Sequence, residues 1–254
     1  MRRPASIYGS SLSSLGPGPV STALKALIAA NVVMFVLQSV FSPIPNRLLG
    51  LHPAWVIPAP SGPAPEHAFW LWQTATYMFL HAGIFHILFN MLALWMFGAE
   101  LERIWGTRYF LKFYFVTGIG AGALTVLFSL FPFTGLQSAN IIGASGAIYG
   151  LLLAYAMYFP DRPILLIVFW VPAKWCVAIL GAIALFSSLS DAGGTANATH
   201  LGGLLIGYLM LRGSRMHPWS EVKYRYLKWK INRVRKKFDV LSGGRADDYD
   251  RRVH

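Results

Sequence analysis

The sequence predicts an all-α polytopic membrane protein, built as a bundle of six transmembrane helices. Of its 254 residues, 55% are hydrophobic and only 13% are charged, whereas a soluble domain carries roughly 25% charged residues. Long stretches contain no Asp, Glu, Lys or Arg, and most of the remaining Lys and Arg fall on one side of the predicted membrane. Cys176 is the single cysteine, so no intrachain disulfide can form.

The spans follow from the uncharged runs, because a helix needs about 20 apolar residues to cross a bilayer. Residues 26–46 and 192–211 have room for one span each, and residues 113–160 have room for two. The run 67–99 fits one span and a loop, and the shorter run 175–190 fits one span. The predicted spans are 22–41, 82–102, 109–131, 145–158, 174–189 and 199–212.

The connections between the spans differ in composition. The loop 42–80 is rich in Pro and Trp, and we expect it to fold back onto the membrane surface, since Trp favours the interface. Residues 132–144 and 190–199 are predicted to be external turns. The stretch 158–163 predicts a cytoplasmic break, and residues 164–171 are too few to cross, so they are expected at the inner interface.

The distribution of Lys and Arg predicts the orientation, because short cytoplasmic connections are enriched in both. With both termini in the cytoplasm, the external side receives only Arg47. The cytoplasmic side receives all the others, including the charges that follow span six. No segment has the pattern of a cleavable signal peptide, because the first apolar run begins late and is long enough to remain as a span.

Three regions are predicted on this basis: a disordered segment at 1–21, a six-span domain at 22–212 and a basic tail at 213–254. From residue 212 onward there are 13 Lys and Arg against 5 Asp and Glu, which supplies most of the net charge of +12. Apolar residues recur at helical spacing in the tail, which predicts an amphipathic helix on anionic lipid. The alternative is a solvated cytoplasmic helix. Nucleic-acid binding is not expected, because membrane lipid already provides an anionic partner.

The first polar motif within a span is His86-Ile87-Leu88-Phe89-Asn90. His86 and Asn90 are four residues apart, so they share one face of span two near its external end. Polar side chains are costly in a membrane and often functional. Two interpretations of His86 and Asn90 are open: an interhelical hydrogen bond, or a pair of donors for a developing oxyanion.

The second and third motifs lie on spans four and six. Glycines surround Ser145, and Gly146 with Gly150 forms a small face for close helix packing. His200 precedes a similar glycine face on span six. Two helices packed through these faces bring a hydroxyl and an imidazole base together, which is the geometry that nucleophilic catalysis needs. Each motif alone is also explained by simple helix packing.

Together these motifs resemble the rhomboid family of intramembrane serine proteases. The matching pieces are His86-x-x-x-Asn90, Gly143-x-Ser145-Gly146 and Ala198-Thr199-His200-Leu201-Gly202-Gly203, in this order on spans two, four and six. The resemblance covers roughly residues 22–212. It implies a six-transmembrane-helix rhomboid-like bundle with a water-filled cavity open to the external side.

The resemblance also implies the roles of individual residues. Ser145 is expected to be the nucleophile and His200 the general base, in a dyad without an acidic third member. Tyr149 is expected to stack on His200. His86, Asn90 and the backbone N–H of Ser145 are expected to form the oxyanion hole, with Gly143 and Gly146 supporting it. No metal or other cofactor is expected.

Several details depart from this expectation or compete with it. Many family members carry Trp-Arg in the first external loop, whereas here Trp72 is followed by Gln73. His81 is expected to be a structural hydrogen-bonding residue, with catalysis as the minor alternative. Asp191 is the acid nearest to span six, so it is a minor candidate for a third catalytic member. Glu100, Glu102 and Arg103 are expected to anchor the inner loop.

The expected function is hydrolysis of peptide bonds in or near the transmembrane segment of single-span proteins. One alternative is a non-proteolytic relative that binds transmembrane helices, which has no need of both Ser145 and His200. Another is a transporter or channel, which requires polar residues along a path across the bilayer; below Asn90 span two is apolar. By resemblance to the family, a six-span core without an added seventh span and without an organelle-targeting peptide is expected in a bacterial inner membrane.

Overall fold

The computed structural model describes residues 20–53, 69–131, 134, 136, 139–166, 169–189 and 194–215. The chain divides into two compact units, Met1–Leu211 and Arg212–His254. Of the second unit, the described residues are 212–215. Three parts of the sequence prediction therefore lie outside the described residues. They are the segment 1–21 except for its last two residues, the basic tail beyond 215, and Asp191.

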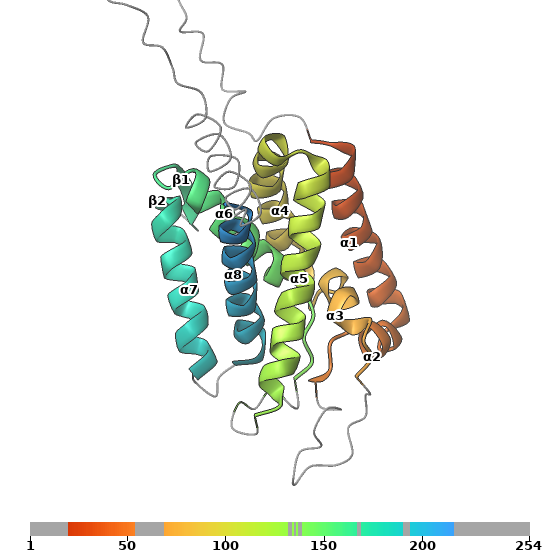
Figure 1. The fold of residues 1–254 in the computed structure, drawn as a ribbon. Coiled ribbons are helices and arrows are strands. Elements are labelled where there is room, and N and C mark those ends of the chain that lie inside the picture. The colour runs from red at the N-terminus through yellow and green to blue at the C-terminus, as the bar shows by residue number, and fades with distance from the viewer. Residues whose placement is uncertain are drawn as a thin grey trace, which may run out of the picture. The chain divides into compact units, whose positions relative to one another are not determined.

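The first unit is a bundle of long helices (Figure 1). These helices are α1 (Thr22–Phe41), α4 (Ile84–Trp105), α5 (Thr107–Ser129), α6 (Ser145–Tyr158), α7 (Ala173–Leu189) and α8 (Gly194–Arg215). Among the described residues, α1, α4 and α5 are long and apolar enough to cross a membrane, and α6 and α7 are shorter apolar helices. The predicted fold is confirmed as a mostly helical bundle with several apolar helices; the count of six spans and the orientation stay predictions.

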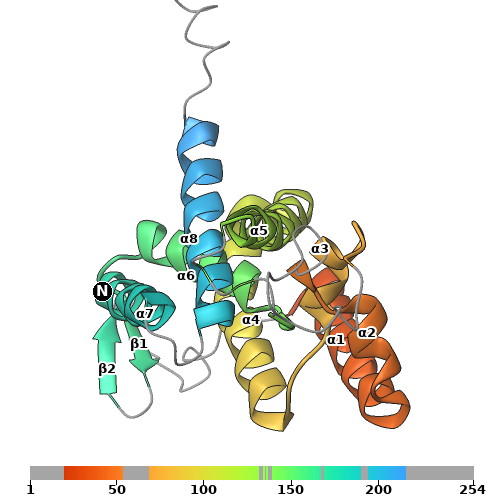
Figure 2. The same ribbon diagram turned by 90° about the horizontal axis from the view of Figure 1, so that it is seen from below.

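Helix α6 occupies the centre of the bundle (Figure 2). It contacts α4, α5 and α7 directly, and its glycines lie against α8. A helix that is apolar all round is buried on all sides, and Ala147, Leu151 and Ala154 of α6 are fully buried. The peripheral helices instead expose large apolar side chains, such as Val40 of α1, Phe85 of α4 and Phe186 of α7. Such an outer surface fits a lipid environment and not water.

Short elements fold the first connection onto the bundle. Helix α2 (Ile44–Leu49) packs on α1, and α3 (Gln73–Thr76) packs on α5, followed by the 3₁₀ turn η3 (Tyr77–Phe79). Leu51 then forms an isolated antiparallel bridge with Ile141, the segment that leads into α6. Residues 54–68 of this connection lie outside the described residues.

The expectation of an all-α fold is wrong in one place. Strands β1 (Pro163–Leu166) and β2 (Phe169–Pro172) form an antiparallel hairpin with Ile164 opposite Val171. The segment 164–171 was expected to be too short to cross, and pairing the two halves of so short a segment satisfies backbone groups that a broken helix leaves open. Leu165, Phe169 and Trp170 remain exposed on the hairpin.

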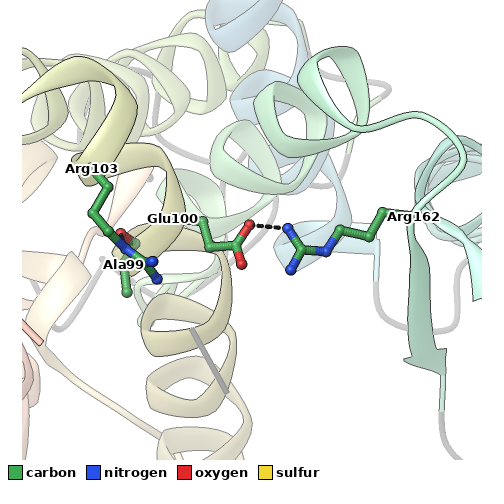
Figure 3. A network of polar contacts seen from close by, with 4 residues as sticks. All are labelled: Ala99, Glu100, Arg103 and Arg162. Atoms are coloured by element: carbon green, nitrogen blue, oxygen red, sulfur yellow. Dashed lines mark hydrogen bonds and ion pairs between the residues drawn. The ribbon is translucent and has the colours of Figure 1, made fainter. Parts of the chain in front are cut away.

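Charged residues hold the end of the bundle that lies opposite Ser145, which we call the Arg162 end. Glu100 of α4 forms an ion pair with Arg162, while Arg103 turns the other way and donates from Nε to the carbonyl oxygen of Ala99 (Figure 3). The buried carboxylate of Glu102 accepts from Ser21 Oγ and from Thr107 Oγ1, both at 2.6 Å. Glu102 thereby joins the first turns of α1 and α5, where negative charge is favoured by the helix dipole.

Candidate active site

Ser145 is the first residue of α6, so its N–H belongs to the first turn, where backbone donors have no intrahelical acceptor. Gly143, two residues earlier, has a φ of +128° and donates its N–H to the carbonyl oxygen of Tyr77 at 2.9 Å. A Cβ atom at Gly143 would lie 2.8 Å from Nε2 of His86. Only glycine therefore permits this backbone shape and this close approach of the His86 ring.

Ser145 and His200 meet across the interface of α6 and α8. His200 Nε2 lies 2.8 Å from Ser145 Oγ. The approach depends on glycines, because a Cβ atom at Gly203 would lie 2.0 Å from the carbonyl oxygen of Gly146, and one at Gly207 would lie 3.0 Å from Cα of Gly150. The glycine faces therefore set the depth at which the two polar side chains lie opposite each other.

His200 lies further inside its helix than the sequence indicated. Span six was expected from residue 199, but α8 begins at Gly194, because the small and polar residues 194–198, which precede the apolar run, are also helical. Thr199 is held by a hydrogen bond of 2.9 Å between its Oγ1 and that of Thr125 on α5. No sequence pattern points to this hydroxyl pair, in which both side chains are buried.

Tyr149 packs flat on the imidazole of His200. The ring centroids are 4.2 Å apart and the rings are inclined by 7°. Nδ1 of His200 is buried and has no hydrogen-bond partner among the described residues. Among the described residues, the flat stack on Tyr149 is thus the contact that sets the plane of the His200 ring. In a Ser-His-Asp triad, a carboxylate orients the histidine instead.

His86 and Asn90 lie on α4 beside the dyad. The N–H of Ala82 donates to Nδ1 of His86 at 3.2 Å, so Nδ1 is unprotonated and we assign the ring hydrogen to Nε2. Asn90 Nδ2 donates to the carbonyl oxygen of His86 at 2.9 Å, which uses one of its two amide hydrogens. One donor on each side chain is therefore left for another acceptor.

All these polar groups face one cavity of about 300 Å³. It is lined by the side chains of Ser145, His200, Tyr149, His86 and Asn90, together with three apolar residues from α4 and α6, namely Phe85, Phe89 and Ile148. The cavity combines a serine hydroxyl next to an imidazole with nearby hydrogen-bond donors and an apolar wall. These are the parts that acyl transfer requires. Among the described residues, no group of three His, Cys, Asp or Glu side chains could hold a metal ion.

His81 lies behind His86 rather than in the cavity wall. Its side chain is buried, and its ring meets that of His86 edge-on with centroids 5.1 Å apart. Burial, and then the neighbouring His86, lower the pKa of His81 to about 4, so the imidazole is neutral. The expectation that the His81 side chain makes a structural hydrogen bond is not met among the described residues, where its ring nitrogens have no partner. Its backbone N–H donates to Gln38 Oε1 at 2.9 Å.

Comparison with known proteins places this chain in a family. A family model described as "Rhomboid domain" matches residues 68–214. The chain is 34% identical over 134 residues to rhomboid protein 1, mitochondrial, of Saccharomyces cerevisiae, covering 52% of this chain and 38% of that protein. It is 31% identical over 144 residues to the rhomboid protease GlpG of Yersinia pestis, covering 55% and 47%.

A third relative is the rhomboid protease GluP of Bacillus subtilis, 41% identical over 81 residues, which are 32% of this chain and 14% of that protein. The chain thus spans less than half the length of each of these relatives. The family match nevertheless covers more than half of this chain and includes all three helices that line the cavity. The protein belongs to the rhomboid family and is an integral membrane protein.

Proposed function

We propose that this protein is a rhomboid-type intramembrane serine endopeptidase. The observation that carries the proposal is the 2.8 Å contact of His200 Nε2 with Ser145 Oγ inside a cavity between apolar helices. The names of the GlpG and GluP relatives, each a rhomboid protease, support the same activity. The substrate class is single-span membrane proteins, cleaved in or near their transmembrane segment.

The proposed reaction begins when Ser145 Oγ attacks the carbonyl carbon of the scissile peptide bond while His200 Nε2 takes the hydroxyl proton. The carbonyl oxygen becomes negative and is stabilised by the Ser145 N–H, the His86 Nε2 hydrogen and the remaining Asn90 amide hydrogen. His200 then gives its proton to the leaving amine. Water then attacks the acyl carbon while His200 takes its proton. As the bond to Ser145 Oγ breaks, His200 returns that proton to Oγ, which releases the second product and restores the serine hydroxyl.

The rest of the proposed arrangement follows from charge and burial. All six long helices cross the membrane in this proposal, with both termini in the cytoplasm and the cavity open to the external side. Among the described charged residues, Arg47 alone belongs to the connections on the Ser145 side, in agreement with this orientation. The basic tail at 213–254 is proposed to lie on anionic lipid. A bacterial inner membrane remains the proposed location, although the relatives include a mitochondrial protein.

The test is cleavage of a fluorescent single-span substrate by the full chain in liposomes. Ser145→Ala and His200→Ala are each expected to reduce kcat by at least about 10³-fold, since the hydroxyl and its base act as a unit. Ser39→Ala is the matched control, because Ser39 Oγ lies on α1 and donates to the carbonyl oxygen of Phe35 in its own helix. Full activity of Ser145→Ala would contradict the proposal.

Labelling with a fluorophosphonate separates a protease from a non-proteolytic relative that binds transmembrane helices. Phosphonylation requires an activated serine hydroxyl, so a protease is labelled and Ser145→Ala is not. A helix binder retains the substrate segment without being labelled. Equal labelling of wild type and Ser145→Ala would show that the reactive hydroxyl lies elsewhere.

A further inference from the structure

Gln73, the first residue of α3, has a fully buried amide that ties together separate parts of the first connection. Its Oε1 accepts from the N–H of His52 at 3.3 Å and from the N–H of Trp70 at 3.2 Å. Its Nε2 donates to the carbonyl oxygen of Arg47 at 3.4 Å. A single side chain therefore acts as acceptor and donor toward three points of the backbone.

Leu51, the residue before His52, is bonded to the segment that precedes Ser145. Leu51 exchanges two backbone hydrogen bonds with Ile141, both of 3.0 Å. Two residues after Ile141 comes Gly143, which lies against the His86 ring and bonds to the carbonyl oxygen of Tyr77. Ser145 follows two residues later. The backbone of the oxyanion hole is thus separated from the Gln73 amide by one bridge and a few residues.

Other side chains support this connection at different places. Thr76 Oγ1 donates to the carbonyl oxygen of Leu49 at 2.8 Å, and Trp72 Nε1 donates to that of Leu48 at 2.9 Å. Both hold the end of α2, whereas Gln73 bonds to the N–H beside the Leu51–Ile141 bridge. Buried polar networks are costly when they are half satisfied. Loss of the Gln73 acceptor removes a hydrogen bond from the N–H of the buried residue His52, next to this bridge.

We propose that Gln73 is a positioning residue for the oxyanion hole, which it holds in register with His86 through His52, Leu51 and Ile141. The proposal rests on the proposed protease function. It also explains why a neutral amide fits at this position, where many family members carry Arg. A guanidinium has five donors and no acceptor, so at residue 73 it would face the N–H groups of His52 and Trp70.

The main test is Gln73→Met, which keeps the length of the side chain and removes its acceptor and donor. Turnover is expressed per active site, counted by the endpoint of fluorophosphonate labelling. We expect kcat to fall about 10-fold, because small misplacements of catalytic groups are costly, while KM changes less than about twofold. The matched control is Thr74→Val on the same short helix, since Thr74 Oγ1 donates only locally, to the carbonyl oxygen of Leu71.

Two more variants keep the proposal testable if Gln73→Met does not fold. Gln73→Glu preserves an acceptor for both N–H groups, so it is expected to retain more of the wild-type kcat than Gln73→Arg, which preserves none. Equal kcat per active site in Gln73→Met, Gln73→Arg and wild type would overturn the proposal. The proposal would also be overturned if the loss of activity equalled the loss of folded protein, because Gln73 would then act only on stability.

Hydrogen exchange provides a readout that does not depend on activity. In Gln73→Met the amides of Leu51, Ile141 and Gly143 are expected to exchange faster than in wild type, while amides of α6 beyond its first turn keep their rates. Unchanged exchange at Ile141 and Gly143 contradicts the positioning role. If wild type shows no Ser145-dependent labelling, the proposed function fails on its own, and the exchange result still decides whether Gln73 holds this segment.

Discussion

The two ends of the helical bundle use different chemistry to hold their connections. Around Ser145, neutral groups make the contacts: the Gln73 amide, the Gly143 backbone and the Thr125–Thr199 hydroxyl pair. At the Arg162 end, the contacts are ionic, as in the pairs Glu100–Arg162 and Lys174–Asp161. Neutral hydrogen bonds and glycine contacts are short-ranged and sensitive to geometry, whereas exposed ion pairs tolerate movement.

This contrast indicates that the contacts at the Ser145 end set atomic positions accurately, whereas those at the Arg162 end mainly hold the connections together as anchors. A catalytic site loses rate when its groups move by about an ångström. An anchoring contact at a membrane surface needs only to persist. Substitutions at the Ser145 end should therefore change kcat, and those at the Arg162 end should change stability with little effect on kcat.

Among substitutions that leave Ser145, His200 and the donors on α4 in place, the largest effect is expected from Gly203→Ala. The new Cβ atom would lie 2.0 Å from the carbonyl oxygen of Gly146, a rigid backbone atom, so α8 must move away from α6 and carry His200 with it. We expect at least about a 100-fold loss of fluorophosphonate labelling rate. Gly181→Ala on α7 is the control, because its Cβ meets only the end of the Leu204 side chain at 3.3 Å. Equal labelling by both variants would contradict the glycine interface.

Features that arise from a local pattern in the sequence could be predicted from it. The spans 22–41 and 145–158 were predicted at the bounds that α1 and α6 have, because apolar runs mark the bodies of these helices and the turn-forming residues beside them mark the ends. The Ser145–His200 contact could be anticipated because glycines at regular spacing on two helices imply a close approach.

Other features could not be read from the sequence, because they depend on contacts between distant segments. The bridge between Leu51 and Ile141 joins two loops that carry no pattern of their own. The buried bonds of Gln73 come from a residue type that is usually exposed. The β1–β2 hairpin replaced an expected apolar segment at the interface, since strand pairing over four residues leaves only a faint alternation.

The second prediction concerns the donors on α4. His86→Ala removes the ring that contacts Gly143 and the Nε2 hydrogen assigned to the oxyanion hole. Loss of one such donor is expected to lower kcat by about 10²–10³-fold with little change in KM. Steady-state cleavage of the single-span substrate measures both constants. A kcat within about threefold of wild type would remove His86 from the oxyanion hole.

The third prediction separates the ring of Tyr149 from its hydroxyl group. Tyr149→Phe retains the stack on His200 and is expected to keep nearly the wild-type kcat. Tyr149→Leu loses the stack, and because such ring pairs contribute about 0.5–1.5 kcal/mol, kcat should fall roughly two- to tenfold. If Tyr149→Phe loses as much activity as Tyr149→Leu, the hydroxyl group and not the ring face supports His200.

The fourth prediction turns to Glu102, at the Arg162 end. Glu102→Leu leaves the hydroxyls of Ser21 and Thr107 without their shared acceptor. We expect the free energy of unfolding to fall by about 1–3 kcal/mol, measured by denaturant titration in detergent. Turnover per labelled active site is expected to stay within about twofold of wild type. A fall in kcat without loss of stability would contradict the division between the two ends.

The smallest effect is expected from the Glu100–Arg162 pair, which Figure 3 shows beside Arg103, whose Nε donates to the carbonyl oxygen of Ala99 instead. The Arg162 side chain is 45% exposed and that of Glu100 is 13% exposed, so water and salt screen their attraction. A double-mutant cycle with Glu100→Gln and Arg162→Met should give a coupling free energy below about 1 kcal/mol that weakens further in high salt. A coupling well above that value, or one that changes kcat, would mean that the ionic end also communicates with Ser145. The contrast between an accurate end and an anchoring end would then have to be abandoned.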